Sequence, residues 1–185
     1  MGEILDKAIN FAVDAHKGQF RKHTDTPYIL HPLEAAAIVG TMTSDDEVIA
    51  AAVLHDVIED TDTDIETVEK IFGKRIAGFV SAESEDKRED RPAVETWKIR
   101  KEETLAHLRT APTEVKMITL GDKLSNVRAI NRDLKKYGED LWQRFNQKDK
   151  KQQYWYYKSI ADLLSELKDT AAYNEYVGLL ESSFM

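Results

Sequence analysis

Four side chains that bind metal ions well stand far apart in the chain: His31, the doublet His55 and Asp56, and Asp122. Imidazole nitrogens and carboxylate oxygens without a thiolate suit a fairly hard divalent ion, such as Mn²⁺, Fe²⁺ or Mg²⁺, better than a structural Zn²⁺. Four protein ligands leave two positions of an octahedral ion for water and substrate. The set therefore predicts one divalent metal site, and a carboxylate-rich site of this kind favours hydrolysis of a phosphate ester.

Two further carboxylates follow the doublet in the segment AVLHDVIEDT. Glu59 and Asp60 come four residues after His55 and Asp56, so all four side chains are expected on one helical surface. The small apolar residues before them predict that this surface is buried, where an unpaired charge is costly. A metal ion resolves that cost, as would a salt bridge. With an ion bound, Glu59 and Asp60 are the candidates to orient or deprotonate a water molecule.

Asp122 stands on a second apolar stripe. Val115, Ile118 and Asp122 follow the spacing i, i+3, i+7 of one helix face, and Asn126 lies one turn further on. An aspartate among core residues requires a cation or a hydrogen-bonding partner. Taken alone, Asp122 is equally well explained as a buried hydrogen-bonding residue. Its combination with the two histidines and Asp56 is what favours the metal site.

Helical periodicity extends over almost the whole chain, and no alternating run of strand length is present. Ser44 with Glu47, and Thr63 with Glu66, fit the capping-box pattern at the start of two helices. The polar segment 81–93 is expected to be a mobile loop near the site. These features predict an all-α protein with a single domain over residues 1–185. The expected helices cover about 4–16, 30–40, 47–59, 65–72, 76–80, 94–109 and 113–134, with two or three more in the tail, one of them around 153–157.

Composition and charge narrow the classes of partner. The formal net charge of −8 argues against general binding of DNA or RNA, because that affinity depends on neutralising phosphates. No apolar run approaches the roughly 20 residues that cross a bilayer, and the N-terminus does not resemble a signal peptide. The absence of cysteine excludes disulfides and is compatible with a reducing cytoplasm, the expected location. A small anionic molecule remains as the expected ligand.

Short basic clusters could recognise such a ligand. Arg21 and Lys22 lie in a polar loop ahead of His31, where they are candidates to pair with phosphates or to stack on a base. The alternative for this pair is an ordinary solvated loop. For Lys98, Arg100 and Lys101 the sequence leaves open whether they reach a substrate or lie on a solvated helix face.

The motifs around these residues resemble those of a known superfamily. His31, the His55-Asp56 doublet and Asp122 resemble the H…HD…D signature of HD phosphohydrolases. More narrowly, RKHTDTPYILHP, AAVLHDVIEDT and GDKLSNVR resemble the hydrolase half of RelA/SpoT alarmone enzymes, over roughly residues 8 to 130. A chain of 185 residues leaves no room for a following synthetase domain, so it is most similar to the stand-alone small alarmone hydrolases of the metazoan SpoT type.

The resemblance implies a helical HD domain with one bound manganese ion. It implies removal of the 3′-pyrophosphate of (p)ppGpp to give GDP or GTP and diphosphate. The residues that match the family's metal ligands are His31, His55, Asp56 and Asp122. Those that match its catalytic acidic pair are Glu59 and Asp60. Those that match nucleotide contacts are Arg21, Lys22 and Asn126, with Lys150 and Tyr154 in a looser alignment.

Two alternatives stay open at this point. The same metal chemistry could act on another nucleotide, such as the 2′-phosphate of NADPH or a nucleoside monophosphate. A different class is a non-catalytic nucleotide sensor on the same scaffold. The presence of both Glu59 and Asp60 argues against a sensor, since a site without catalytic activity would not need this acidic pair.

Overall fold

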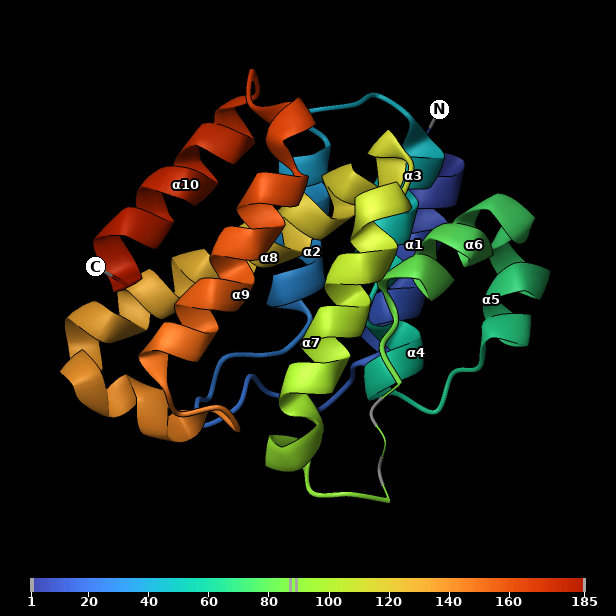
Figure 1. The fold of residues 1–185 in the computed structure, drawn as a ribbon. Helices are drawn as coiled ribbons and strands as arrows, with labels where there is room; N and C mark the ends of the chain where they lie inside the picture. Colours follow the sequence, from blue (N-terminus) through green and yellow to red (C-terminus); the bar gives the residue numbers. More distant parts are fainter. Residues whose placement is uncertain (1, 87, 89, 185) are drawn as a thin grey trace. The chain divides into compact units, whose positions relative to one another are not determined.

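The computed structural model describes residues 2–86, 88 and 90–184 and confirms the all-α class. These described residues contain helices and one isolated bridge, between Phe20 and Pro27, but no strand (Figure 1). They form two compact units. The first unit comprises residues 2–84 and 112–122, and the second comprises 85–111 and 123–184. The expectation of a single domain over the whole chain stays a prediction.

The first unit is arranged around helix α3 (Asp46–Leu54), which packs against three other helices of the unit. Its residues 50–54 are all fully buried. A helix that is apolar on every side must lie inside the core, and the alanines allow neighbouring helices to approach closely. The other helices of this unit are α1 (Glu3–Ala15), α2 (Leu30–Val39), α4 (Val57–Asp60), α5 (Ile65–Phe72), α6 (Lys74–Glu83) and the beginning of α8 (Thr113–Tyr137).

Two details of the first unit differ from the sequence expectations. The caps of α3 and α5 are the aspartates Asp45 and Asp64, which accept hydrogen bonds from the backbone N–H groups of Glu47 and Thr67 at 3.0 and 2.8 Å. The prediction that Ser44 and Thr63 cap these helices is therefore wrong by one residue in each case. Asp caps a helix at least as well as Ser or Thr, so the sequence offered two neighbouring candidates at each position. The expected helix to about Glu59 is interrupted after residue 54, so that α3 and α4 are separate.

The second unit is arranged around α9 (Lys150–Leu163), which packs against α7 (Ala93–Thr110) and α10 (Ala171–Phe184). The unit also contains the later part of α8 and two short 3₁₀ helices, Gly138–Arg144 and Ser165–Leu167. Its core is rich in aromatic side chains, with ring centroids of neighbouring aromatics 5.2–6.3 Å apart. Offset and edge-to-face aromatic pairs at such distances are favourable.

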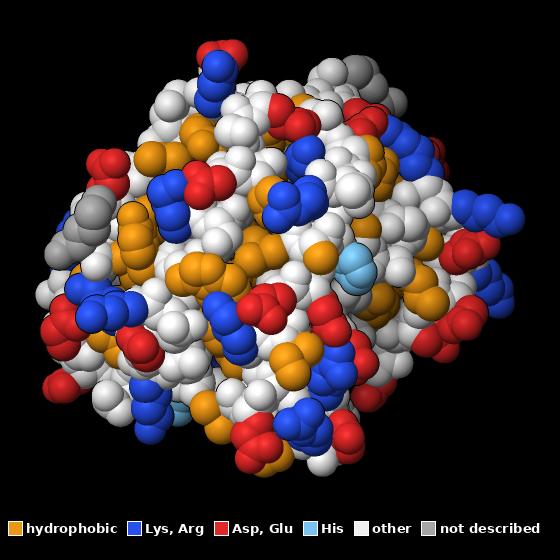
Figure 2. Space-filling model, in the orientation of Figure 1, with side chains coloured by type: hydrophobic (Ala, Val, Ile, Leu, Met, Phe, Trp, Pro, Cys, Tyr) orange, Lys and Arg blue, Asp and Glu red, His pale blue; other side chains and the backbone are white. Residues whose placement is uncertain are grey.

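Residues 84–86, 88 and 90–92 between α6 and α7 are irregular, as expected, while residues 81–83 belong to α6 and Ala93 to α7. Lys87 and Glu89 lie outside the described residues, and the mobility of the segment stays a prediction. None of the helices in the described residues has the length and apolar character needed to cross a membrane. Acidic and basic side chains are interspersed over the face of the molecule seen in Figure 2.

Candidate metal centre

His31, His55 and Asp122 converge inside the first unit, although 91 residues separate the first from the last. One ligand atom from each lies within 4.8 Å of the others, and all three residues are buried. The Nε2 atom of His31 is 3.2 Å from Oδ1 of Asp122, and that of His55 is 3.8 Å from the same oxygen. Asp56 adds its Oδ2 atom at 3.4 Å from His31 Nε2 and 3.1 Å from His55 Nε2.

Local structure explains where each of these side chains stands. His31 occupies the first turn of α2, where the following Pro32 is tolerated because the N–H groups of that turn lack helical partners. His55 and Asp56 occupy the junction between α3 and α4. Asp122 lies in α8 on the buried stripe that its spacing from Ile118 predicted.

A glycine lets α8 approach α2 closely enough for these residues to meet. A Cβ atom on Gly121 would lie 2.7 Å from the carbonyl oxygen of Ala35 and 2.8 Å from Cγ2 of Val39, both in α2. Contacts that short do not occur, so any larger residue would push the two helices apart. The neighbouring Asp122 reaches His31 because of this close approach.

The donor geometry fits one divalent ion. Ligand atoms that bind an octahedral ion at about 2.1 Å and at right angles lie about 3.0 Å apart. The imidazole–carboxylate separations of 3.1–3.8 Å are close to that value. The Nδ1 atom of His55 lies 2.8 Å from the carbonyl oxygen of Ala52, which can only accept, so Nδ1 carries the proton. In the neutral ring the lone pair is then on the buried Nε2, which makes no hydrogen bond within the described residues.

The electrostatic environment also favours a positive charge here. Burial lowers the pKa of His55, but Asp56 and then Asp122 raise it further, to about 10. Burial raises the pKa of Asp56, but the two imidazoles hold it well below its ordinary value. Two carboxylates and two imidazoles in so small a space therefore stabilise either a proton or a metal ion. The two-aspartate, two-histidine donor set is the one that hard divalent ions accept.

Tyr28 connects the metal-ligand candidates to the acidic pair, and the sequence analysis did not identify it. Its hydroxyl oxygen lies 2.7 Å from Oδ2 of Asp56 and 2.7 Å from Oδ2 of Asp60. The phenol ring also packs against His16, with centroids 4.9 Å apart. Burial and then the two carboxylates raise the pKa of Tyr28, so its hydroxyl stays protonated and donates. Asp56 and Asp60 thus lie on one side of α4, as their spacing predicted. The Thr-Pro-Tyr run that precedes α2 is the only sequence signal for it.

The remaining residues of the first unit that were singled out are arranged as follows. The guanidinium carbon of Arg21 lies 5.7 Å from the centre of the Tyr28 ring, so this side chain is near the acidic pair. Lys22 is exposed. Glu59 is half-buried in α4, next to Asp60.

The other three candidates belong to the second unit. Asn126 follows Asp122 by one turn along α8. Lys150 and Tyr154 lie one turn apart on α9. The Nζ atom of Lys150 lies 3.2 Å from Glu139, and the ring of Tyr154 packs on Phe184.

The basic cluster of α7 has partners inside the second unit. Arg100 and Lys101 both pair with Glu85 at 2.8 Å, and the Nζ atom of Lys98 lies 2.9 Å from the centre of the Trp155 ring. Burial, followed by the charge of Lys123, lowers the pKa of Lys101 despite its pairing with Glu85. Arg100 and Lys101 are therefore packed against protein groups, whereas the Lys98 side chain is 45% exposed.

The chain resembles a known protein family and several known proteins. The HD domain family model matches residues 8–150. The chain is 39% identical over 133 residues to the guanosine-3′,5′-bis(diphosphate) 3′-pyrophosphohydrolase MESH1 of Danio rerio, covering 70% of each chain. It is 35% identical to the MESH1 protein of Xenopus tropicalis, over 98% of this chain and 93% of that one.

Among solved structures, one described as a metazoan ortholog of SpoT that hydrolyzes ppGpp superimposes with a TM-score of 0.77. It is 26% identical, over 97% of this chain and 95% of that chain. The fold, the family model and the sequence relatives agree. The chain belongs to the HD domain family and, within it, to the family of guanosine-3′,5′-bis(diphosphate) 3′-pyrophosphohydrolases.

Proposed function

We propose that this protein removes the 3′-pyrophosphate of (p)ppGpp by hydrolysis, giving GDP or GTP and diphosphate. The observation that carries the proposal is the buried cluster of His31, His55 and Asp122, with Asp56 in contact with both imidazoles. The names of the MESH1 relatives, and the description of the solved SpoT ortholog, supply the substrate.

The residues that would hold one divalent ion are His31, His55, Asp56 and Asp122. When bound, such an ion lowers the pKa of a water molecule and polarises a phosphoryl oxygen. The protein fixes the tautomer of His55 through the hydrogen bond of Nδ1 to Ala52, which directs the Nε2 lone pair towards the cluster. We take Mn²⁺ as the metal, with Fe²⁺ and Mg²⁺ as the other hard ions that suit these ligands.

Asp60 and Glu59 are the proposed catalytic acidic pair. In the reaction a water oxygen bonds to the phosphorus attached to O3′, the P–O3′ bond breaks, and the leaving ribose oxygen gains a proton. A carboxylate that removes the proton from water must be oriented towards it. The hydroxyl oxygen of Tyr28 lies 2.7 Å from Oδ2 of Asp60 and 2.7 Å from Oδ2 of the metal-ligand candidate Asp56, so we assign Tyr28 as a positioning residue for Asp60.

Substrate recognition is assigned to basic and polar side chains. Arg21 lies beside Tyr28, where its guanidinium can pair with phosphate or stack on the guanine. Lys22, next to it, is exposed and can contribute a positive charge. For the nucleoside we propose the residues that the family resemblance indicates, namely Asn126, Lys150 and Tyr154. We place the reaction in the cytoplasm, where a cysteine-free chain meets nucleotide substrates.

A nucleotide panel tests the proposal. Purified protein with Mn²⁺ should release diphosphate from ppGpp and no monophosphate, and His55→Ala or Asp122→Asn should reduce the rate by more than about 100-fold. His107→Ala is the matched control, because His107 is exposed on α7. Monophosphate release from NADPH or a nucleoside monophosphate, with ppGpp left intact, would show that the substrate assignment is wrong. Tight ppGpp binding without turnover would instead indicate a sensor.

A further inference from the structure

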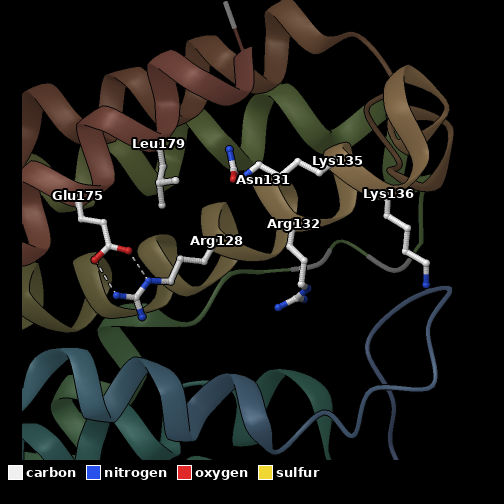
Figure 3. Close-up of a pocket in the computed structure, with 7 residues that line it drawn as sticks. All are labelled: Arg128, Asn131, Arg132, Lys135, Lys136, Glu175 and Leu179. Carbon is white, nitrogen blue, oxygen red and sulfur yellow. Dashed lines mark hydrogen bonds and ion pairs between the residues drawn. The ribbon is translucent and has the colours of Figure 1, made fainter.

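An open groove of about 490 Å³ lies in the second unit between the later part of α8 and helix α10. Figure 3 shows the side chains that line it. Arg128, Arg132, Lys135 and Lys136 come from α8, and Glu175 and Leu179 come from α10. Four cations and one carboxylate therefore line a single space, in a chain whose formal net charge is −8.

The one carboxylate of the groove is already paired. Glu175 accepts hydrogen bonds from Nε and a terminal nitrogen of Arg128, both at 2.7 Å, which the dashed lines in Figure 3 mark. That bonding holds the pKa of Glu175 below its ordinary value. A bidentate pair of this kind neutralises its own charges and fixes the guanidinium. Glu175 therefore does not compensate the other three cations.

The remaining cations have little compensation from protein groups. Nε of Arg132 is 3.6 Å from Oδ1 of Asp133, in a side chain that is 67% exposed, and such surface contacts contribute little. Lys135 is exposed and forms no ion pair within the part of the chain that the structure describes, and the exposed Lys136 is hydrogen-bonded to the hydroxyl of Tyr137. The helix dipole favours cations in the last turn of α8, where both lysines stand. It does not account for Arg132, which precedes that turn.

The cations of the groove lie several turns of α8 beyond the metal-ligand candidate Asp122. Arg128, Arg132 and Lys135 follow the spacing i, i+4, i+7 and share one face. At about 100° and about 1.5 Å per residue, Arg132 and Lys135 lie about 80° and 140° around the helix from Asp122 and about 15 and 20 Å further along its axis. Arg132 and Lys135 therefore do not belong to the turn of α8 that carries Asp122.

We propose that this groove binds a small anion that carries a diphosphate group, either free or attached to a nucleoside. Arg132 and Lys135, with Lys136 at the edge, would pair with the phosphate oxygens. The amide nitrogen of Asn131 donates to Ser182 and Ser183 at 3.2 and 2.9 Å, so its carbonyl oxygen could accept only from an O–H or N–H group of the nucleoside, because ionised phosphate oxygens do not donate. The groove volume lies in the range of small-ligand sites, about 300–1,000 Å³. The proposal does not depend on the reaction proposed above, although both ligand forms are products of that reaction.

The experiment is a titration of metal-free, full-length protein followed by backbone amide NMR. One arm uses inorganic diphosphate and the other uses GDP, so that the two sources of the diphosphate group are distinguished. We expect saturable shifts of the amides of residues 128–136 and 175–179 in at least one arm. The double variant Arg132→Gln/Lys135→Gln should bind about tenfold more weakly or worse, since each lost charge-assisted hydrogen bond is worth about 1.5–3 kcal/mol.

A charge-matched control separates a specific site from general attraction. The double variant Lys148→Gln/Lys151→Gln removes two exposed positive charges that do not line the groove. We expect it to change the affinity less than about twofold, because neither side chain lines the groove and exposed charges are screened at ordinary salt. Equal weakening by both double variants would overturn the proposal. So would a titration in which the amides of residues 128–136 do not shift with either ligand.

Discussion

The backbone of Ala35 and the missing side chain of Gly121 determine how closely α8 approaches α2. A Cβ atom at Gly121 would lie 2.7 Å from the carbonyl oxygen of Ala35, so only glycine allows the observed spacing. The same spacing brings the next residue, Asp122, to 3.2 Å from Nε2 of His31. Assembly of the proposed metal centre therefore depends on the close packing of α2 against α8.

Gly121→Ala should consequently damage both stability and metal binding. Overpacking of this kind costs about 1–3 kcal/mol, and displacement of Asp122 should weaken Mn²⁺ binding. The measurements are urea unfolding and a metal titration of the folded variant. Gly178→Ala is the matched control, because a Cβ there meets no atom within 4 Å and alanine is favoured in the helix α10. Unchanged stability and metal affinity in Gly121→Ala would contradict the structure at this contact.

Tyr28→Phe tests the link between the acidic pair and the metal centre. The variant keeps the ring against His16 but loses the hydroxyl that contacts Asp56 and Asp60. We expect kcat for ppGpp to fall by about 10- to 100-fold with little change in KM, because positioning is lost while substrate contacts remain. Tyr173→Phe removes a hydroxyl that donates to the backbone of Ala161 and serves as the control. A pure change in KM, or equal effects of both variants, would remove Tyr28 from the mechanism.

Metal removal should lower the thermal stability of the protein. Without a cation, the carboxylates of Asp56 and Asp122 repel each other unless protons are taken up nearby. An ion that binds only the folded state stabilises it by about 2.7 kcal/mol at 100 times its Kd. Dialysis against a chelator should therefore lower Tm, and Mn²⁺ should restore it. The restoration should be absent in Asp122→Asn and present in His107→Ala. A Tm that does not respond to Mn²⁺ would argue against a stoichiometric ion.

Asp45→Ala should destabilise α3, whereas Ser44→Ala should not. Loss of an aspartate cap costs about 0.5–2 kcal/mol, and Ser44 is exposed and does not cap α3. The hydrogen bond from Arg75 is the main cause of the lowered pKa of Asp45, so its carboxylate stabilises the folded state above its unfolded pKa of about 3.9. The difference in unfolding free energy between wild type and Asp45→Ala should be constant above about pH 5. It should shrink as the pH falls below about 4, through the lowered folded pKa. A larger loss of stability in Ser44→Ala than in Asp45→Ala would show that Ser44 is the cap, as expected from the sequence.

Local pattern was enough to predict the class of the fold. The helical spacing of apolar residues predicted the helices, and the burial of Asp122 followed from its place on the stripe of Val115 and Ile118. The side-chain types of His31, His55 and Asp56 likewise identified them as candidate ligands for a cation. These are properties of short segments, or of residue types, and the sequence carries them directly.

Tertiary structure decided the features that depend on two distant segments. Tyr28 was not identified because its importance comes from contacts with Asp56 and Asp60, some 30 residues away. The sequence does not distinguish Gly121 from other helix residues, because its role depends on the packing of α2 against it. The groove of the second unit was equally hidden, since Arg132 becomes part of it only when α10 lies beside α8. The sequence pattern predicts which residues share a helix face. Which residues that face contacts depends on the packing of segments far apart in the chain.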